Sequence, residues 1–133
     1  MEKQFEQLIE PKKFNYEGSE FYVGKIPAYN AQKIMLRSGD ALKKFDMTKL
    51  DEETILELLS YSAVVNKGGE AIVLDSPEMV NAVIGQNTEL LIAIEVQILM
   101  ENYGFFLDGA IRRIFDPLIE KMAKAMEDAS KQP

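Results

Sequence analysis

The chain has 133 residues, of which 47% are hydrophobic and 28% are charged, and its formal net charge is −7 at pH 7. It contains no histidine and no cysteine, which excludes the commonest catalytic base, thiolate chemistry, disulfides and the usual zinc-ligand sets. The length and apolar content are typical of a single globular domain, residues 1–133, and the negative charge disfavours general nucleic-acid binding, which depends mainly on lysine and arginine.

The N-terminal part predicts a short helix followed by a β-hairpin. Apolar residues at helical spacing favour a helix over residues 2–10, which Pro11 would end. Apolar and polar residues then alternate on both sides of Gly18, and this pattern predicts a hairpin over residues 13–26. A two-stranded hairpin is only marginally stable by itself, so we expect it to pack on the rest of the chain.

Residues 28–127 are expected to form a helical core. The first helix of this core is predicted over residues 28–45, where apolar residues recur on one face. Gly39 lies near its middle and costs about 1 kcal/mol relative to alanine. We therefore expect a kink or a division into two helices at this position.

The next helix has the clearest start in the chain. Asp51 can cap it, and the two glutamates that follow suit the positive end of a helix dipole. Its inward face is predicted to continue through Ser62 and to stop at the glycines of residues 66–69. The apolar run 70–74 is then either a third strand that joins the hairpin or a buried connector.

Two further helices are predicted from capping residues. Ser76 followed by proline begins one helix, which Gly85 ends, and Asn87 begins the next. That second helix is apolar nearly all round, so we expect it to form the centre of the core. Glutamates interrupt its apolar run, 90–107, and this favours a buried helix over a membrane span.

The last predicted helix runs from about Asp108, with an interruption at Pro117, and residues 128–133 are expected to form a frayed tail. The predicted fold class is therefore α+β, predominantly helical, with a helical core and a small N-terminal β-hairpin. The N-terminus lacks the basic start and apolar stretch of a signal peptide. We accordingly expect a soluble, intracellular protein with no membrane partner.

Carboxylates are the main candidates for chemistry. Glu95 and Glu101 lie on the most apolar helix, where a magnesium-dependent hydrolase could in principle use them. The simpler expectation is that both lie on an exposed strip or pair with Arg112 or Arg113. We therefore predict that the protein is not an enzyme and has no catalytic, cofactor-binding or metal-binding residues.

Exposed apolar side chains are the candidates for partner binding. Methionine adapts to varied surfaces, and Met122 and Met126 lie on the last helix, close to the tail. Phe105 and Phe106 precede that helix. We predict that these four residues contribute to a partner-binding surface.

Two segments resemble a known pattern. One is the hairpin from Phe14 to Pro27, and the other is the end of the apolar helix, Glu101-Asn102-Tyr103-Gly104-Phe105-Phe106. Together with the small acidic chain and its α+β pattern, they resemble tail assembly chaperones of long-tailed bacteriophages of the lambdoid, siphovirus type. These families carry no catalytic signature.

The resemblance implies a specific role. Such a chaperone is a late protein of the infected cell that stays in the host cytoplasm and is absent from the mature virion. It binds the tape measure protein non-covalently and keeps it soluble while the tail tube protein assembles around it. The resemblance also implies a longer product made by ribosomal frameshifting. Coating a long partner favours many copies, so a homo-oligomer is expected as well.

Two other functions fit the same composition. One is an acidic phage regulatory protein or DNA mimic that binds a host protein, which predicts carboxylates along one face at phosphate-like spacing. The other is a structural tail or connector component, which would remain in the particle. We prefer the chaperone because 15 basic residues are interspersed with the 22 acidic ones.

Overall fold

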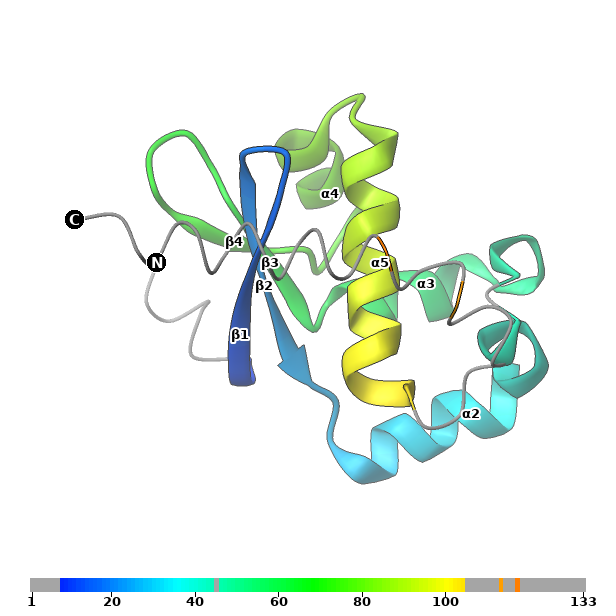
Figure 1. Cartoon of the computed structure of the whole chain (residues 1–133). Helices are drawn as coiled ribbons and strands as arrows, with labels where there is room; N and C mark the ends of the chain where they lie inside the picture. Colours follow the sequence, from blue (N-terminus) through cyan, green and yellow to red (C-terminus); the bar gives the residue numbers. More distant parts are fainter. Residues whose placement is uncertain (1–7, 45, 105–112, 114–116, 118–133) are drawn as a thin grey trace.

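The structure is a computed structural model that describes residues 8–44, 46–104, 113 and 117. The fold is α+β and predominantly helical, as the sequence predicts. In the described part of the chain, four α-helices and one short 3-10 helix (Met47–Lys49) accompany a single four-stranded antiparallel sheet. Figure 1 shows the sheet at one side of the molecule and the helices at the other.

The predicted hairpin is present. Strands β1 (Ile9–Tyr16) and β2 (Ser19–Lys25) pair antiparallel around a two-residue turn. Both turn residues have positive φ, 50° at Glu17 and 90° at Gly18, which is the backbone of the turn that best matches strand twist. Phe14 and Phe21 lie opposite each other in the register and stack with their ring centroids 5.7 Å apart. The hairpin thus carries an aromatic pair into the core.

The predicted helix over residues 2–10 is wrong at its end, and the rest of it lies outside the described residues. Ile9 and Glu10 belong to β1, where Ile9 pairs with Lys25. The register shifts between Ile9 and Lys12, and Glu10 has a φ of 44°, so a bulge admits Pro11 into this edge strand. Pairing with β2 therefore overrides the helical spacing of the apolar residues.

The sheet is larger than the sequence predicts. Strand β3 (Ser62–Val65) pairs antiparallel with β2, and β4 (Ala71–Val73) pairs antiparallel with β3. The continuation of the helix through Ser62 is therefore wrong, and the segment 28–127 is not wholly helical. The run 70–74 is indeed a strand, but it joins β3 and not the hairpin directly.

The helix boundaries follow the predicted caps. Helix α2 (Ala28–Lys43) is kinked at Ser38, which has non-helical dihedral angles. Asp51 caps α3 (Glu52–Leu59) by accepting a hydrogen bond from the Thr54 N–H. Hydrogen bonding from the Thr54 side chain, and then from its N–H, holds the pKa of the Asp51 carboxyl below its usual value. Ser76 caps α4 (Pro77–Ile84) in the same way. Short polar side chains at these positions satisfy amide groups that a helix leaves without partners.

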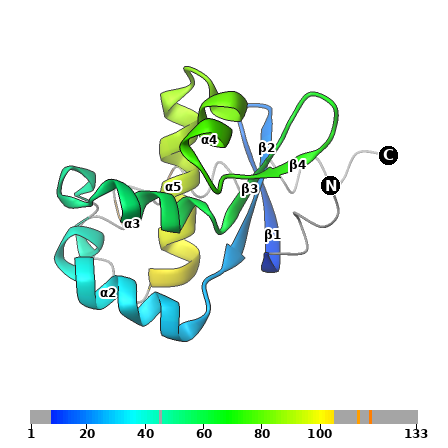
Figure 2. The same cartoon turned by 180° about the vertical axis from the view of Figure 1, so that it is seen from behind.

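Helix α5 (Thr88–Tyr103) forms the centre of the core, as predicted. It packs on β2 and α3, and Asn102 fixes its C-terminal end to the strand. The Asn102 side chain accepts a hydrogen bond of 2.9 Å from the Ile26 N–H and donates one of 3.3 Å to the Gly24 carbonyl. Viewed from behind, α5 stands between the sheet and α2, whereas α4 lies near the upper end of α5, beside β4 (Figure 2).

The last predicted helix and the tail 128–133 lie mostly outside the described residues. Arg113 and Pro117 are described, and both are helical and exposed. Among the described residues, no helix is both long enough and apolar enough to cross a bilayer.

Candidate functional site

The four residues predicted to bind a partner, Phe105, Phe106, Met122 and Met126, all lie outside the described residues. The described part of the chain offers a different candidate. It is a groove of about 610 Å³ between α4, the β3–β4 hairpin and the start of α5. We call it the α4 groove, and it is lined by Ser19, Val64, Val65, Asn66, Lys67, Gly68, Ile72, Met79, Ala82, Val83 and Leu90.

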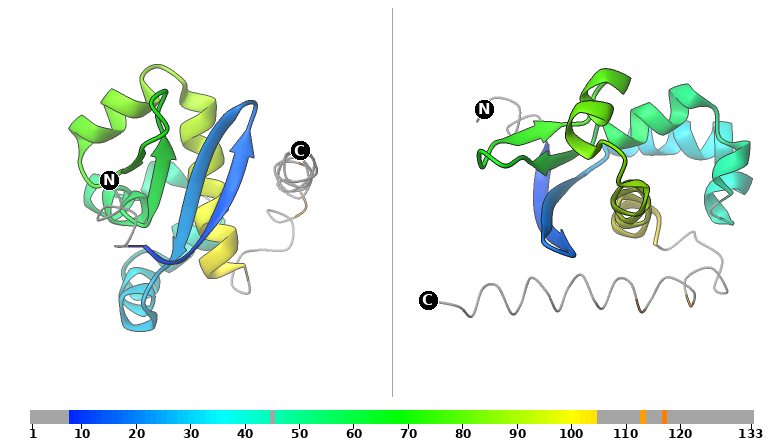
Figure 3. Two further views of the ribbon diagram at one scale, coloured as in Figure 1. Left: turned by 90° about the vertical axis from the view of Figure 1, so that its left-hand side faces the viewer. Right: turned by 90° about the horizontal axis from the view of Figure 1, so that it is seen from above.

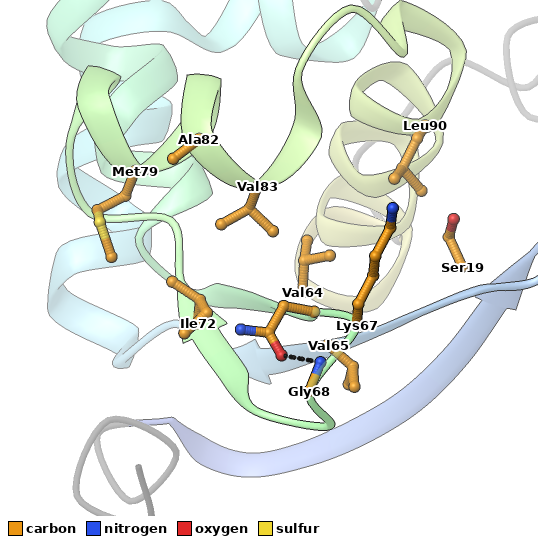
Figure 4. A pocket seen from close by; sticks show the side chains of 11 residues that line it. Ser19, Val64, Val65, Lys67, Gly68, Ile72, Met79, Ala82, Val83 and Leu90 are labelled. Atoms are coloured by element: carbon orange, nitrogen blue, oxygen red, sulfur yellow. Dashed lines mark hydrogen bonds between the residues drawn. The ribbon is translucent and has the colours of Figure 1, made fainter.

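The lining of the α4 groove is mainly apolar. Val64 and Leu90 are buried, whereas Ile72, Met79 and Val83 remain partly exposed. Figure 4 shows Val83 pointing from α4 towards Val64, with Lys67 extended towards Leu90. A partly exposed apolar surface of this kind is typical of a ligand or protein contact.

Local sequence chemistry holds the walls of the groove in place. In the β3–β4 loop, the Asn66 side chain accepts hydrogen bonds of 2.9 Å from the N–H groups of Gly68 and Glu70. Gly69 has a φ of 82°, which favours glycine. On the opposite wall, Gly85 ends α4 with a φ of 63°. The loop and the helix are thus each fixed by local hydrogen bonds and glycine.

The surroundings of the groove are acidic. Four exposed carboxylates lie within a few residues of lining positions: Glu70, Asp75, Glu78 and Glu89. Lys67 is the single basic residue in the segment 50–104, which contains ten acidic residues. The groove therefore combines an apolar floor and one lining cation, Lys67, with four exposed carboxylates next to its lining positions in the sequence. It suits an occupant that is apolar and carries basic side chains beside its apolar contact.

The two candidate carboxylates, Glu95 and Glu101, lie in different environments. Glu101 forms a salt bridge of 3.3 Å with Lys12 and accepts a hydrogen bond of 3.1 Å from the Gln97 side chain. Glu95 is 9% exposed, and among the described residues its side chain has no hydrogen-bond or ion-pair partner. Burial raises the pKa of Glu95 to about 7. Neither carboxylate lies on an exposed strip, and the partner of Glu101 comes from β1.

Gln97 is a second buried polar side chain of α5 with a hydrogen-bonding atom that lacks a partner among the described residues. It is 1% exposed, and its Oε1 atom has no hydrogen-bond partner among the described residues. A buried acceptor without a partner costs about 1–3 kcal/mol. No group of three or more acidic side chains within the described ranges could hold a metal ion, so we assign no metal ligand here.

Three methionines of the described chain have different surroundings. Met35 and Met100 pack against the main core. Met79 lines the α4 groove and belongs to neither described core cluster. The sequence does not predict the groove beside Met79, because β3, which supplies part of its floor, falls in a segment whose pattern predicts a helix.

We compared the chain with protein-family models, with curated proteins and with solved structures, and none of the three comparisons gave a match.

Proposed function

We propose that the protein is a phage tail assembly chaperone that binds apolar helical segments of the tape measure protein non-covalently. The role comes from the resemblance of its two segments to that family, and the α4 groove is the observation that supports it in the structure. One wall of the groove is formed by α4, where Met79 lies about one helical turn from Ala82 and Val83.

The composition of the groove supports a chaperone in two ways. The partly exposed side chains of Ile72, Met79 and Val83 provide apolar contact without a deep, specific pocket, and methionine adapts to different partner surfaces. The exposed carboxylates around the groove keep the complex negatively charged, which opposes aggregation of an apolar partner. Neither property requires a catalytic group, and we propose a non-enzymatic role without a cofactor.

Met79→Glu is a sharp test because it changes the groove while favouring the fold. Met79 is the third residue of α4, and its N–H donates to the Ser76 cap. Glutamate at that position completes a capping box with the serine. The variant therefore places a charge in the groove without weakening the helix. Asn81→Glu is the matched control, since Asn81 is exposed on the same helix and does not line the groove.

The experiment is co-expression with the tape measure protein, the product of the very long open reading frame expected next to the gene. We expect the wild type and Asn81→Glu to keep the tape measure protein soluble. We expect Met79→Glu to lower its soluble fraction several-fold, with no loss of thermal stability of the chaperone itself. Equal solubility with and without the wild-type protein would refute the chaperone role, and equal activity of both variants would refute the groove as its site.

The same proposal places the protein in the host cytoplasm during assembly and outside the finished particle. Mass spectrometry of purified virions tests this placement, because a structural tail or connector component would be recovered in stoichiometric amounts. Absence of the protein from purified virions, together with solubilisation of the tape measure protein, would support the chaperone over the structural component.

One observation favours a second candidate, the acidic regulator or DNA mimic. Basic residues are depleted in the segment 50–104, where ten acidic residues accompany one basic residue. Such a mimic would bind a basic site on a host protein. Affinity capture from infected cells tests it: a host nuclease or polymerase in place of tail components would favour the mimic.

A further inference from the structure

Helix α2 carries a second surface with exposed apolar side chains, which no described element of the chain covers. Tyr29 and Leu36 lie seven residues apart on α2, and their side chains are 69% and 81% exposed. Lys33 lies between them, with its Nζ 5.3 Å from the centre of the Tyr29 ring. Residues spaced in this way share one face of a helix. We call Tyr29, Lys33 and Leu36 the α2 ridge.

The segment of the chain that carries the α2 ridge has an excess of basic residues. The segment 28–49 contains five basic residues and two acidic ones, although the whole chain is acidic. One of the five, Arg37, is held by a salt bridge of 3.2 Å to Glu57. The four lysines of the segment are exposed; Lys33 lies between the two exposed apolar side chains of the ridge, and Lys49 forms an ion pair of 3.8 Å with Asp46.

The ridge and the α4 groove have complementary chemistry. The ridge offers two exposed apolar side chains with Lys33 between them, in a segment with an excess of basic residues. The groove offers an apolar floor that Lys67 also lines, with exposed carboxylates next to its lining positions in the sequence. The two surfaces lie at opposite ends of α5, with α2 below and α4 above in Figure 1, and the side view of Figure 3 agrees. One copy therefore cannot fill its own groove with its own ridge.

We infer that the α2 ridge of one copy docks into the α4 groove of a second copy. The contact is heterologous, because two different surfaces meet, and it can be repeated from copy to copy. Two apolar side chains bury a small area, so the contact belongs to the weak class of interfaces. Much of its strength comes from opposite charges, and it is therefore salt-dependent.

This contact goes beyond the proposed function, since it names a second occupant of the same groove. A copy whose groove holds the ridge of a neighbour has no free groove for a partner helix. Binding of a partner and self-association are therefore mutually exclusive at each groove, and free chaperone is held in short assemblies that the partner disperses.

Sedimentation velocity of the full chain over a wide concentration range tests the inference. At low salt, we expect the wild type to sediment faster as concentration rises, and 0.5 M NaCl should weaken the association at least several-fold. Leu36→Glu removes the ridge at an exposed site, and Met79→Lys places a cation in the groove. Each variant alone is expected to remain monomeric, with an unchanged circular dichroism spectrum.

Mixing the two variants is the decisive measurement. Leu36→Glu retains an intact groove and Met79→Lys retains an intact ridge, so the mixture should form a one-to-one dimer and nothing larger. A wild type that is monomeric at all concentrations, or a mixture that stays monomeric, would overturn the inference. A wild-type dimer that Leu36→Glu abolishes and Met79→Lys does not would show that α2 pairs with itself. Leu36→Glu should still solubilise the tape measure protein, so failure here is distinguishable from failure of the proposed function.

Discussion

The Tyr103 hydroxyl donates a hydrogen bond of 2.9 Å to the main-chain carbonyl of Ala31, which is 72 residues away. The bond joins the last residue of α5 to the first turn of α2, and the Tyr103 side chain is fully buried. It fixes the position of α2 relative to the core. Because α2 carries the ridge and the far end of α5 borders the α4 groove, this bond also helps to set the separation of the two surfaces.

Tyr103→Phe should lower the free energy of unfolding by about 1 kcal/mol, since it removes the hydroxyl and keeps the ring. Burial, followed by the nearby Glu57 carboxylate, raises the pKa of Tyr103 from 10.0 to about 12. The unfolded chain then loses this proton first, so wild-type stability falls as pH rises above 10. Urea unfolding at pH 8 and pH 11 should show that the free energy of unfolding falls less between these pH values for Tyr103→Phe than for the wild type.

Tyr29→Phe is the matched control for Tyr103→Phe. Tyr29 lies on the same helix as Ala31, and its side chain is 69% exposed. Removing its hydroxyl should change stability by less than about 0.5 kcal/mol. Equal losses of unfolding free energy for the two variants would show that the hydrogen bond from Tyr103 to Ala31 does not stabilise the fold measurably.

Glu95→Gln should make the protein more stable at neutral and alkaline pH. Burial raises the pKa of Glu95 from 4.5 to about 7, so the folded protein binds a proton that the unfolded chain has already lost between these values. Wild-type stability should therefore fall as pH rises from 4.5 to 7, by an amount on the order of 3 kcal/mol. Glutamine has the same shape and carries no charge, and the variant should lack this fall.

The measurement is chemical unfolding of the wild type and Glu95→Gln between pH 4 and pH 8. At pH 4 the two proteins should be nearly equal in stability, because the glutamate is protonated in both the folded and unfolded states. At pH 8 the variant should be the more stable. A difference that is constant across this range would show that packing, and not ionisation, distinguishes the two side chains.

Elements that depend on local chemistry could be predicted from the sequence. The hairpin turn at Gly18, the caps at Asp51 and Ser76, and the kink at Ser38 all occur where the residue types place them. Each involves contacts within four residues, so the sequence alone determines them.

Elements that depend on long-range pairing could not be predicted. Strand β3 has four residues, too few for a period to distinguish it from a helix end, and it is held by β2 and β4. Ile9 is likewise held in β1 by its pairing with Lys25 of β2, which is distant in the sequence. The α4 groove lies between these elements, and it could not be foreseen without β3. The helical spacing of Tyr29 and Leu36 can be read from the sequence. Only their exposure in the structure shows that no described part of the chain covers them.

Gly24→Ala should destabilise the pairing of β1 with β2. A Cβ atom on Gly24 would lie 3.1 Å from the Leu8 Cβ and 3.2 Å from the Ile9 amide nitrogen. The neighbouring backbone would have to move, and such overpacking costs about 1–3 kcal/mol. Gly68→Ala is the control, because its Cβ would meet only the Asn66 side chain, at 3.4 Å, in an exposed loop. Thermal unfolding should show a lower midpoint for Gly24→Ala alone, and equal midpoints would mean that β1 adjusts freely.

Polar substitution at Phe105, Phe106, Met122 or Met126 tests whether partner binding extends beyond the α4 groove. We expect glutamine at an exposed member of this set to lower the soluble fraction of co-expressed tape measure protein without lowering the thermal midpoint of the chaperone. The physical reason is loss of apolar contact area, at about 25 cal/mol for each Å² that is no longer buried.

The control for this set is Met122→Leu, which keeps the volume and apolar character of the side chain. It should solubilise the partner as well as the wild type does. A combination with Met79→Glu distinguishes two surfaces from one: effects on binding that add indicate separate contacts with the partner, because distant sites act independently. If glutamine at all four positions lowers the thermal midpoint, the four side chains belong to the core, and the groove is left as the binding surface.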